Sequence, residues 1–398
     1  MTQPNDSQAD YQKALDLTPA EYRQQIEDAA TPIEMKVLQL HQHGRQWADK
    51  QQFEAAIAHY NQAIDAQPNY YPAWSDRADA LKQLGRDEEA LASYRQAIQT
   101  NPDYLPALKG EASLLSKLGR YHEAFKDYTA AIERDPNDYS LWRDRGVVLL
   151  QLEQQAEGLA SLEKALELNP DAAEVWSLKA LEMARLHQRE QALESCDRAI
   201  AADPKEHSAW RLRGLLFKEK QPDVALENYD KALELNPDDA ELWIYKAKAL
   251  SHLRREEDAV ISYDRALKLL PHEFHLWYQR GLSLRRLGRF EGAIASFDEA
   301  LSLNPFCYPA SRSRLYSLLT TGTLVSHLLG NCSVAEQQRL WHDLNQIQTV
   351  FVKRKLPTLV VIGLVALFST HSQSIALLVA SLFAGVAVWS DLIREAEK

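Results

Sequence analysis

The chain has 398 residues, of which 45% are apolar and 25% are charged, so it is long enough for two or three ordinary domains and lacks the composition of a disordered tail. Its 45 basic and 56 acidic residues give a net charge of −11, which argues against nucleic acid as a partner because phosphate neutralisation needs a basic surface. The three cysteines, Cys196, Cys307 and Cys332, lie far apart, which excludes a disulfide framework and indicates a reducing compartment.

Residues 1–36 form a polar N-terminal segment. The first ten residues have neither a basic flank nor an apolar core, so we expect no signal peptide. Thr18 and Thr31 are each followed by a proline, a pattern typical of a capped helix start because proline is favoured in the first helical turn. We therefore expect short helices ahead of the next region.

Residues 37–307 consist of eight copies of one repeat. Their prolines recur at steps of 34 residues, with one step of 33: Pro68, Pro102, Pro136, Pro170, Pro204, Pro237, Pro271 and Pro305. With these prolines numbered 32 in each repeat, alanine occupies position 27 every time, alanine or glycine occupies position 20, and position 24 is mostly aromatic. Tryptophan occupies position 4 in six repeats: Trp74, Trp142, Trp176, Trp210, Trp243 and Trp277.

Each repeat has the pattern of a helix, a turn and a second helix. In repeat two, residues 71–104, apolar residues at spacings of three and four mark two amphipathic helices, Gly85 lies between them, and Asn101 and Pro102 end the second. Small residues at positions 20 and 27 allow close helix approach, and large residues at positions 4 and 24 fill the remaining space. Because one repeat cannot bury its own apolar face, the repeats are expected to stack on a continuous core.

This pattern closely resembles the tetratricopeptide repeat (TPR). The resemblance covers about two thirds of the chain and implies an all-α fold, a right-handed solenoid of helix-turn-helix units. Repeat six, residues 207–239, is one residue short, and Gln221 and Pro222 mark the deletion in its turn. We expect its helices to be unaffected.

Residues 308–349 are predicted to hold two more helices. The first, residues 308–319, is expected to cap the open end of the stack. The second begins near Ser333 and has an apolar face formed by Leu340, Trp341, Leu344, Ile347 and Phe351. That face is expected to pack either against the repeats or on a bilayer surface.

Residues 350–398 have the pattern of a membrane anchor. No charged residue occurs from Leu356 to Ser390, a stretch too long for one straight span of a hydrocarbon core of about 30 Å. The polar residues 371–374 divide it, which predicts a transmembrane hairpin of two apolar helices, about 356–371 and 374–390. Basic residues flank both ends, so both are expected to face the cytoplasm. The alternative is an unusually apolar pair of buried helices in a soluble domain.

The sequence contains no motif that indicates catalysis. No glycine-rich phosphate loop, nucleophile elbow or paired acid motif is present. His41 and His43 form a close pair but lack the further ligands that a metal site needs. We therefore expect no enzyme activity, no metal, no cofactor and no small-molecule substrate, and we expect Cys196, which occupies core position 24, to be inert.

The TPR resemblance implies a binding groove, since in that family positions 2, 5, 6, 9, 12 and 13 of the first helix face inward. Here these positions hold eleven basic and seven acidic residues, against the acidic balance of the whole chain. Apolar residues join them in repeats four to eight. The predicted groove consists of Arg143, Val147, Leu150, Leu178, Leu181, Arg185, Arg211, Leu212, Leu215, Lys218, Ile244, Tyr245, Lys248, Tyr278 and Arg285. Alternatively, the basic side chains only solvate an idle face and the leucines pack between helices.

The function expected from these features is that of a membrane-anchored, non-enzymatic TPR adaptor. It would bind a protein or peptide with apolar and acidic side chains in its groove, at the cytoplasmic face of a membrane. The alternative is a structural or assembly subunit of a membrane protein complex, with the groove filled by the protein's own segments.

Overall fold

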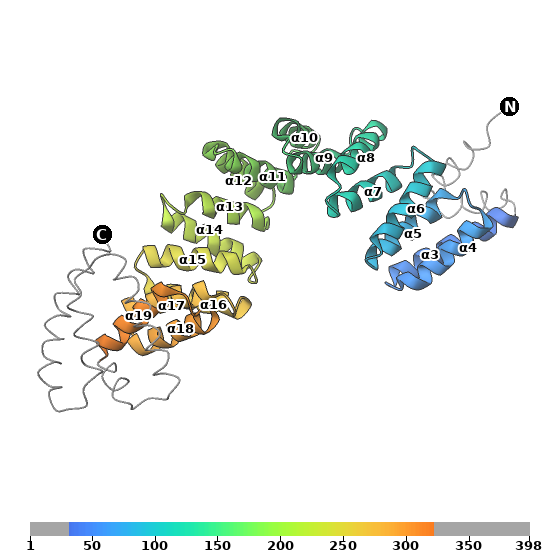
Figure 1. Cartoon of the computed structure of the whole chain (residues 1–398). Helices are drawn as coiled ribbons and strands as arrows, with labels where there is room; N and C mark the ends of the chain where they lie inside the picture. The colour runs from blue at the N-terminus through green and yellow to red at the C-terminus, as the bar shows by residue number, and fades with distance from the viewer. Residues whose placement is uncertain (1–31, 322–398) are drawn as a thin grey trace, which may run out of the picture. The chain divides into compact units, whose positions relative to one another are not determined.

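A computed structural model describes residues 32–321 of the chain, and this part is α-helical, with no strand. Figure 1 shows successive helices paired as antiparallel hairpins. None of the helices in residues 32–321 combines the length and apolar character needed to cross a membrane. The predicted N-terminal segment up to residue 31, the helix from Ser333 and the transmembrane hairpin lie outside the described residues.

Each of the eight predicted repeats contains two helices. The first helices are α3 (Pro32–Asp49), α5 (Tyr71–Gln83), α7 (Leu105–Lys117), α9 (Tyr139–Gln151), α11 (Ala173–Arg185), α13 (His207–Phe217), α15 (Ala240–His252) and α17 (Phe274–Arg286). The second helices are α4 (Phe53–Ala66), α6 (Asp87–Thr100), α8 (Tyr121–Arg134), α10 (Gln155–Leu168), α12 (Arg189–Ala202), α14 (Pro222–Leu235), α16 (Glu256–Leu269) and α18 (Phe290–Leu303). The predicted capping helix is α19 (Tyr308–Thr320), which packs against α17 and α18.

The start of the array differs from the sequence prediction. A helix begins at Pro32, as the Thr31-Pro32 pattern indicates, but α3 then continues without a break through the first helix of repeat one. Residues 33–37 contain neither glycine nor proline, so nothing there ends the helix. Residues 32–36 therefore belong to the repeat array and form no separate short helix.

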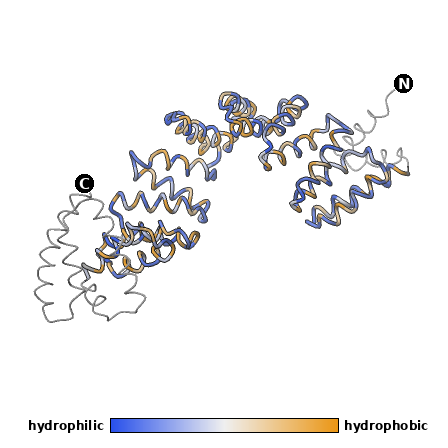
Figure 2. The backbone as a smooth tube through the Cα atoms, in the orientation of Figure 1, coloured by the Kyte–Doolittle hydropathy of each residue, from blue (hydrophilic) through white to orange (hydrophobic). Residues whose placement is uncertain are grey.

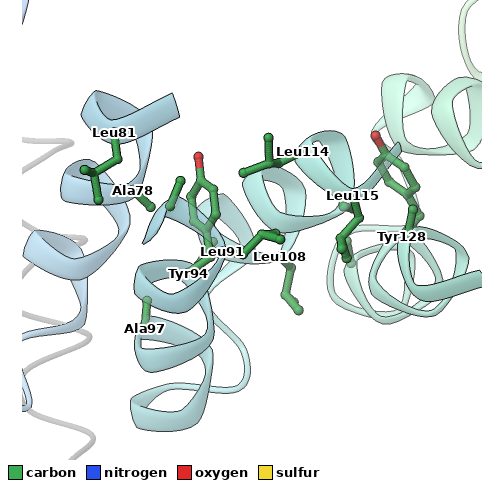
Figure 3. Close-up of a cluster of buried hydrophobic side chains, with 14 of the residues drawn as sticks. Ala78, Leu81, Leu91, Tyr94, Ala97, Leu108, Leu114, Leu115 and Tyr128 are labelled. Atoms are coloured by element: carbon green, nitrogen blue, oxygen red, sulfur yellow. The ribbon is translucent and has the colours of Figure 1, made fainter. Parts of the chain in front are cut away.

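On either side of repeat six, the core lies between the two helices of a repeat and between neighbouring repeats. The alanine at position 27 is fully buried in all eight repeats, and the side chains at position 24 are at most 3% exposed. Figure 3 shows Tyr94, Leu91 and Ala97 of repeat two next to Leu108 and Leu114 of repeat three. The hydropathy colouring in Figure 2 alternates along each helix, as expected when one face of each is buried. The packing predicted for positions 20, 24 and 27 is confirmed.

A further small position supports this packing and was missed by the sequence reasoning. Position 8 of the first helix holds only glycine or alanine, for example Gly44, Ala78 and Gly281. A Cβ atom added to Gly281 would lie 2.5 Å from Cε1 of Phe297, the position 24 ring of the same repeat. Position 8 is small because the side chain at position 24, in most repeats a ring, occupies the space that a larger residue would need.

The tryptophans at position 4 join one repeat to the next. Each of the six donates a hydrogen bond from Nε1 to the carbonyl oxygen of the proline at position 32 of the preceding repeat, over 2.8–3.0 Å. These rings are only partly buried. The sequence predicts that these rings fill the core. In the structure they mainly hold the turn between repeats by a hydrogen bond.

Ion pairs also cross between repeats, from position 25 of one to position 7 of the next. Examples are Lys179 with Glu163 at 3.0 Å and Arg280 with Asp264 at 2.6 Å. In repeats two and three the charges are reversed, since Arg95 pairs with the buried Glu111 at 2.8 Å. Most of these side chains are partly exposed, so each pair contributes modestly to stability.

Repeat six contains the boundary between two compact parts of the described chain, an N-terminal body that ends at Leu216 and a C-terminal body that begins at Phe217. Seven repeats have a residue with φ between 59° and 74° at position 15 of the turn, including Gly85 and Arg254. Repeat six lacks it, since Gln221 there has φ −142°. Helix α13 has 11 residues, against 13 in α11, so the expectation that the deletion spares the helices is wrong. The missing residue is the one with a positive φ angle. In the other seven repeats this left-handed residue follows a first helix of full length.

Candidate functional site

The predicted groove residues are divided between the two bodies, which are considered separately. The N-terminal body holds nine of them, from Arg143 to Leu215, and the C-terminal body holds the other six, from Lys218 to Arg285. All lie on the first helices of their repeats except Lys218, which follows the end of α13.

The basic groove residues of the N-terminal body are largely paired with carboxylates. Arg143 Nε lies 2.7 Å from Asp144 Oδ1, and its Nη1 lies 3.4 Å from Glu174 Oε1. Burial opposes the charge of Arg143, but the hydrogen bond to Asp144 and the nearby charges of Asp144 and Glu174 together outweigh burial and raise the pKa of the guanidinium. Arg185 lies 3.4 Å from Glu182, which is 4% exposed and is not one of the inward positions. The excess of basic over acidic residues at the inward positions is therefore partly neutralised by these carboxylates.

The apolar groove residues of the N-terminal body divide into two kinds. Leu150 and Leu178 pack against a buried cluster that includes Leu162 and Val175, so these two belong in part to the stack. Leu181 is 49% exposed, an unusual value for a leucine in a packed array. Val147, Leu212 and Leu215 are partly buried.

Most groove residues of the C-terminal body contact other side chains of that body. Ile244 packs beside a cluster containing Leu267 and Leu276, and the rings of Tyr278 and Phe297 lie 6.0 Å apart. Lys218 lies over the ring of Tyr245 at 6.0 Å. The guanidinium of Arg285 lies 5.3 Å from the ring of Tyr316 on α19, a cation–π contact.

Lys248 lines a hollow of about 260 Å³ in repeats seven and eight. Helices α15, α16 and α17 and the turn after α15 supply its lining: Lys248, Ser251, His252, Arg254, Tyr263, Gln279 and Arg286. Of these, only Lys248 is in the predicted site, although Ser251, His252, Gln279 and Arg286 occupy inward positions. Arg254 and Tyr263 were missed because one is in the turn and the other is a core ring. The available signal was a tyrosine hydroxyl at a core position, which needs a hydrogen-bond partner.

Other reactive side chains are occupied or buried. His41 is 4% exposed, with Nε2 at 2.8 Å from Asp76 Oδ2 and Nδ1 accepting a hydrogen bond from the Tyr70 hydroxyl at 3.1 Å. Burial raises the pKa of the Cys196 thiol to about 12, so the prediction that Cys196 is inert is supported. Residues 32–321 contain no group of three or more potential metal ligands. Cys332 lies outside the described residues.

Comparison with known families supports the repeat assignment. A family model described as tetratricopeptide repeat matches residues 43–104, 110–173 and 215–274, and a second model of the same description matches residues 274–307. Together these matches span more than half of the chain. No curated protein matches the chain.

Solved structures of TPR proteins resemble the chain. The C-terminal part of a TPR repeat-containing protein from Cytophaga hutchinsonii is 14% identical, with a TM-score of 0.50, and the match covers 60% of this chain and 98% of that one. This likeness concerns the fold alone. YrrB, described as a TPR protein with an unusual peptide-binding site, is 25% identical, with a TM-score of 0.38 over 46% of this chain and 94% of that one. PilF of Pseudomonas aeruginosa is 19% identical, with a TM-score of 0.48, and the match covers 55% of this chain and 100% of that one.

Proposed function

Because the chain belongs to the tetratricopeptide repeat family, we propose that it is a non-enzymatic adaptor that binds a protein or peptide segment along the first helices of its repeats. The observation that carries this proposal is that these helices keep side chains outside the core. Leu181 is 49% exposed on α11, and Lys248 on α15 makes no ion pair with any described residue. Apolar burial of a partner at such positions supplies affinity, and charge complementarity supplies register.

The partner segment has both apolar and acidic side chains. Arg185 is the basic groove residue best placed for it in the N-terminal body, since its side chain is 62% exposed. A carboxylate on the partner would form a charge-assisted hydrogen bond with such a guanidinium. Arg143 is less available, because Asp144 and Glu174 already hold it.

The adaptor is anchored in a membrane by residues 350–398, with the repeats and both termini on the cytoplasmic side. This part of the proposal rests on the sequence, in which residues 356–390 carry no charge and basic residues flank both ends. Reporters placed after Lys398 and between Gln348 and Lys353 should both report the cytoplasm. Opposite sides for the two reporters would mean a single span and end the hairpin proposal.

Crosslinking in intact membranes tests the adaptor role. A photoreactive residue at position 185, one helical turn from Leu181 on α11, should capture a distinct protein, and the captured protein should disappear when Leu181→Asp is added to the same chain. Leu303→Asp is a suitable control, because Leu303 is also partly exposed, at 38%, but lies on a second helix. Circular dichroism should show that both variants keep their helices.

The outcome of this experiment also separates the adaptor from its alternative. Crosslinks from position 185 only to residues 1–17 or 321–350 of the same chain would favour a structural or assembly subunit whose groove is filled internally. If the captured protein were unchanged in the Leu181→Asp variant, the first helix of repeat five would not be the binding surface.

A further inference from the structure

The hollow in repeats seven and eight lies entirely within the C-terminal body and carries excess positive charge. Arg286 is neutralised, since its Nη1 lies 3.2 Å from Oε1 of Glu256, a carboxylate that is 4% exposed. Glu256 also accepts a hydrogen bond from Ser251 at 3.0 Å, so both oxygens of this carboxylate already have partners. Lys248 and Arg254 remain, and neither side chain forms an ion pair with the residues that the structure describes. Two uncompensated cations therefore line one small hollow.

The side chain of a buried tyrosine also lines this hollow. Tyr263 is 1% exposed, yet its hydroxyl makes no hydrogen bond with any residue in the described part of the chain. Burial raises the pKa of Tyr263 to about 12, although the nearby Arg286 opposes the shift. The hydroxyl is therefore protonated at neutral pH and is available as a hydrogen-bond donor.

Repeat two shows what this tyrosine lacks. Tyr94 occupies the same position 24 and donates a hydrogen bond of 2.5 Å to Asp79, at position 9 of its repeat. In repeat seven, position 9 is Lys248, which is a donor and cannot accept that bond. The acceptor that completes the site in repeat two is absent from repeat seven.

We propose that the hollow formed by Lys248, Arg254 and Tyr263 binds an oxyanion, a carboxylate or phosphate group carried by the peptide partner. Such a group supplies the acceptor for the tyrosine hydroxyl and the negative charge for the two cations. The hollow fits one such group and not a whole ligand, since pockets for drug-sized molecules range from about 300 to 1,000 Å³. A peptide anchored here would extend along the first helices. The peptide origin of the anion rests on the function proposed above.

The direct test uses inorganic phosphate with the full-length protein in detergent, followed by phosphorus NMR line broadening. Phosphate should bind, and Lys248→Gln and Arg254→Asn should each weaken binding at least fivefold. Asparagine is chosen at position 254 because the backbone there has φ 61°, a conformation that asparagine tolerates. Lys268→Gln is the matched control, because Lys268 is an exposed lysine on α16 outside the hollow, and this change should leave binding intact.

Tyr263→Phe separates ligand contact from a structural role. It should weaken phosphate binding by threefold or more while leaving the midpoint of urea unfolding unchanged, because the ring still fills the core. Equal phosphate binding by wild type, Lys248→Gln and Arg254→Asn would overturn the proposal. A loss of binding in Tyr263→Phe that is accounted for by unfolding of the variant would also overturn the proposal.

Peptides then identify the source of the anion. Labelled seven-residue peptides of alternating leucine and alanine, with glutamate, phosphoserine or serine at the centre, are compared by fluorescence anisotropy. The glutamate peptide should bind more tightly than the serine peptide if a carboxylate is the ligand, and the phosphoserine peptide most tightly if phosphate is. Binding of inorganic phosphate without any peptide preference would support the hollow and count against the adaptor function. A partner crosslinked at position 185 without phosphate binding would support the adaptor function and count against the hollow as a binding site.

Discussion

Repeats two and seven share one helix-turn-helix scaffold but surround the tyrosine at position 24 with different charges. Both bury a tyrosine ring at position 24, and both pair position 17 with position 13 of the following repeat, Asp87 with Lys117 and Glu256 with Arg286. Two of the surface positions at which they differ matter for this tyrosine. Position 9 is Asp79 in repeat two and Lys248 in repeat seven, and position 15 is Gly85 in one and Arg254 in the other.

The difference teaches that the core and the surface of this repeat vary independently. The rings at position 24 fill equivalent spaces, so the backbone is the same in both repeats. Repeat two satisfies its tyrosine internally through Asp79, whereas repeat seven leaves the hydroxyl to an external acceptor. A TPR array can therefore be searched for binding sites by asking where an internal hydrogen bond is lost.

The largest expected effect tests the shared core. Gly281→Ala places a Cβ atom 2.5 Å from the Phe297 ring, and Gly44→Ala crowds the Tyr60 ring in the same way in the N-terminal body. Each change should lower the free energy of unfolding by about 1–3 kcal/mol, although alanine normally favours a helix. Gly292→Ala is the control, since its nearest neighbour would be 3.4 Å away, and it should be neutral or stabilising in urea unfolding. Equal stability of all three variants would contradict the packing described for position 8.

A smaller effect concerns position 23, which is Asp127 in repeat three and Ser262 in repeat seven. Burial and the nearby charge of Glu111 raise the pKa of Asp127 to about 7. The folded protein therefore keeps a proton between pH 4 and 7 that the unfolded chain releases, so this group's contribution to stability is lost as pH rises through 7. Asp127→Asn should be more stable than wild type at pH 8 by about 1–2 kcal/mol, discounted for partial exposure, and about equal at pH 4.

Urea unfolding of wild type, Asp127→Asn and Ser262→Ala across this range gives the answer. Ser262 does not titrate, so Ser262→Ala should keep the pH profile of the wild type. A parallel profile for Asp127→Asn would mean that Asp127 is ionised in the folded protein at pH 5.

The two tyrosines themselves give the next test. Tyr94→Phe removes the donor to Asp79 and should lower the free energy of unfolding by about 1 kcal/mol. Tyr263→Phe should change it by less than about 0.5 kcal/mol, because that hydroxyl has no partner in the described residues. Chemical denaturation followed by circular dichroism measures both. If Tyr263→Phe cost as much as Tyr94→Phe, the hydroxyl of Tyr263 would have a partner inside the protein.

The smallest expected effect is chemical. Cys196 fills position 24 of repeat five and is fully buried, so it should react with iodoacetamide only as the N-terminal body unfolds. Labelling followed by mass spectrometry in increasing urea should follow the unfolding curve. Labelling of Cys196 in the native protein would show that repeat five opens locally, unlike its neighbours.

Part of the site was accessible from the sequence and part was not. The inward positions drew attention to Lys248, Leu181 and Arg185, because a repeat carries a position's direction from one copy to the next. They also selected Leu150 and Ile244, which pack against buried clusters, because periodicity gives the face of a helix but not how far a neighbouring helix covers it. Arg143 was counted as a free charge, although Asp144 and Glu174 pair with it.

The sequence by itself determined the repeat, its two helices and the burial of positions 20, 24 and 27, because local periodicity and residue size dictate which side chains the stack encloses. The tertiary structure decided what depends on which individual groups meet in space. These features are the tryptophan hydrogen bonds to proline carbonyls, the two bodies divided in repeat six, and the Tyr263 hydroxyl, which has no partner among the described residues. A hydrogen bond or an ion pair forms only when two groups meet within about 3 Å, and a one-dimensional pattern does not contain that distance.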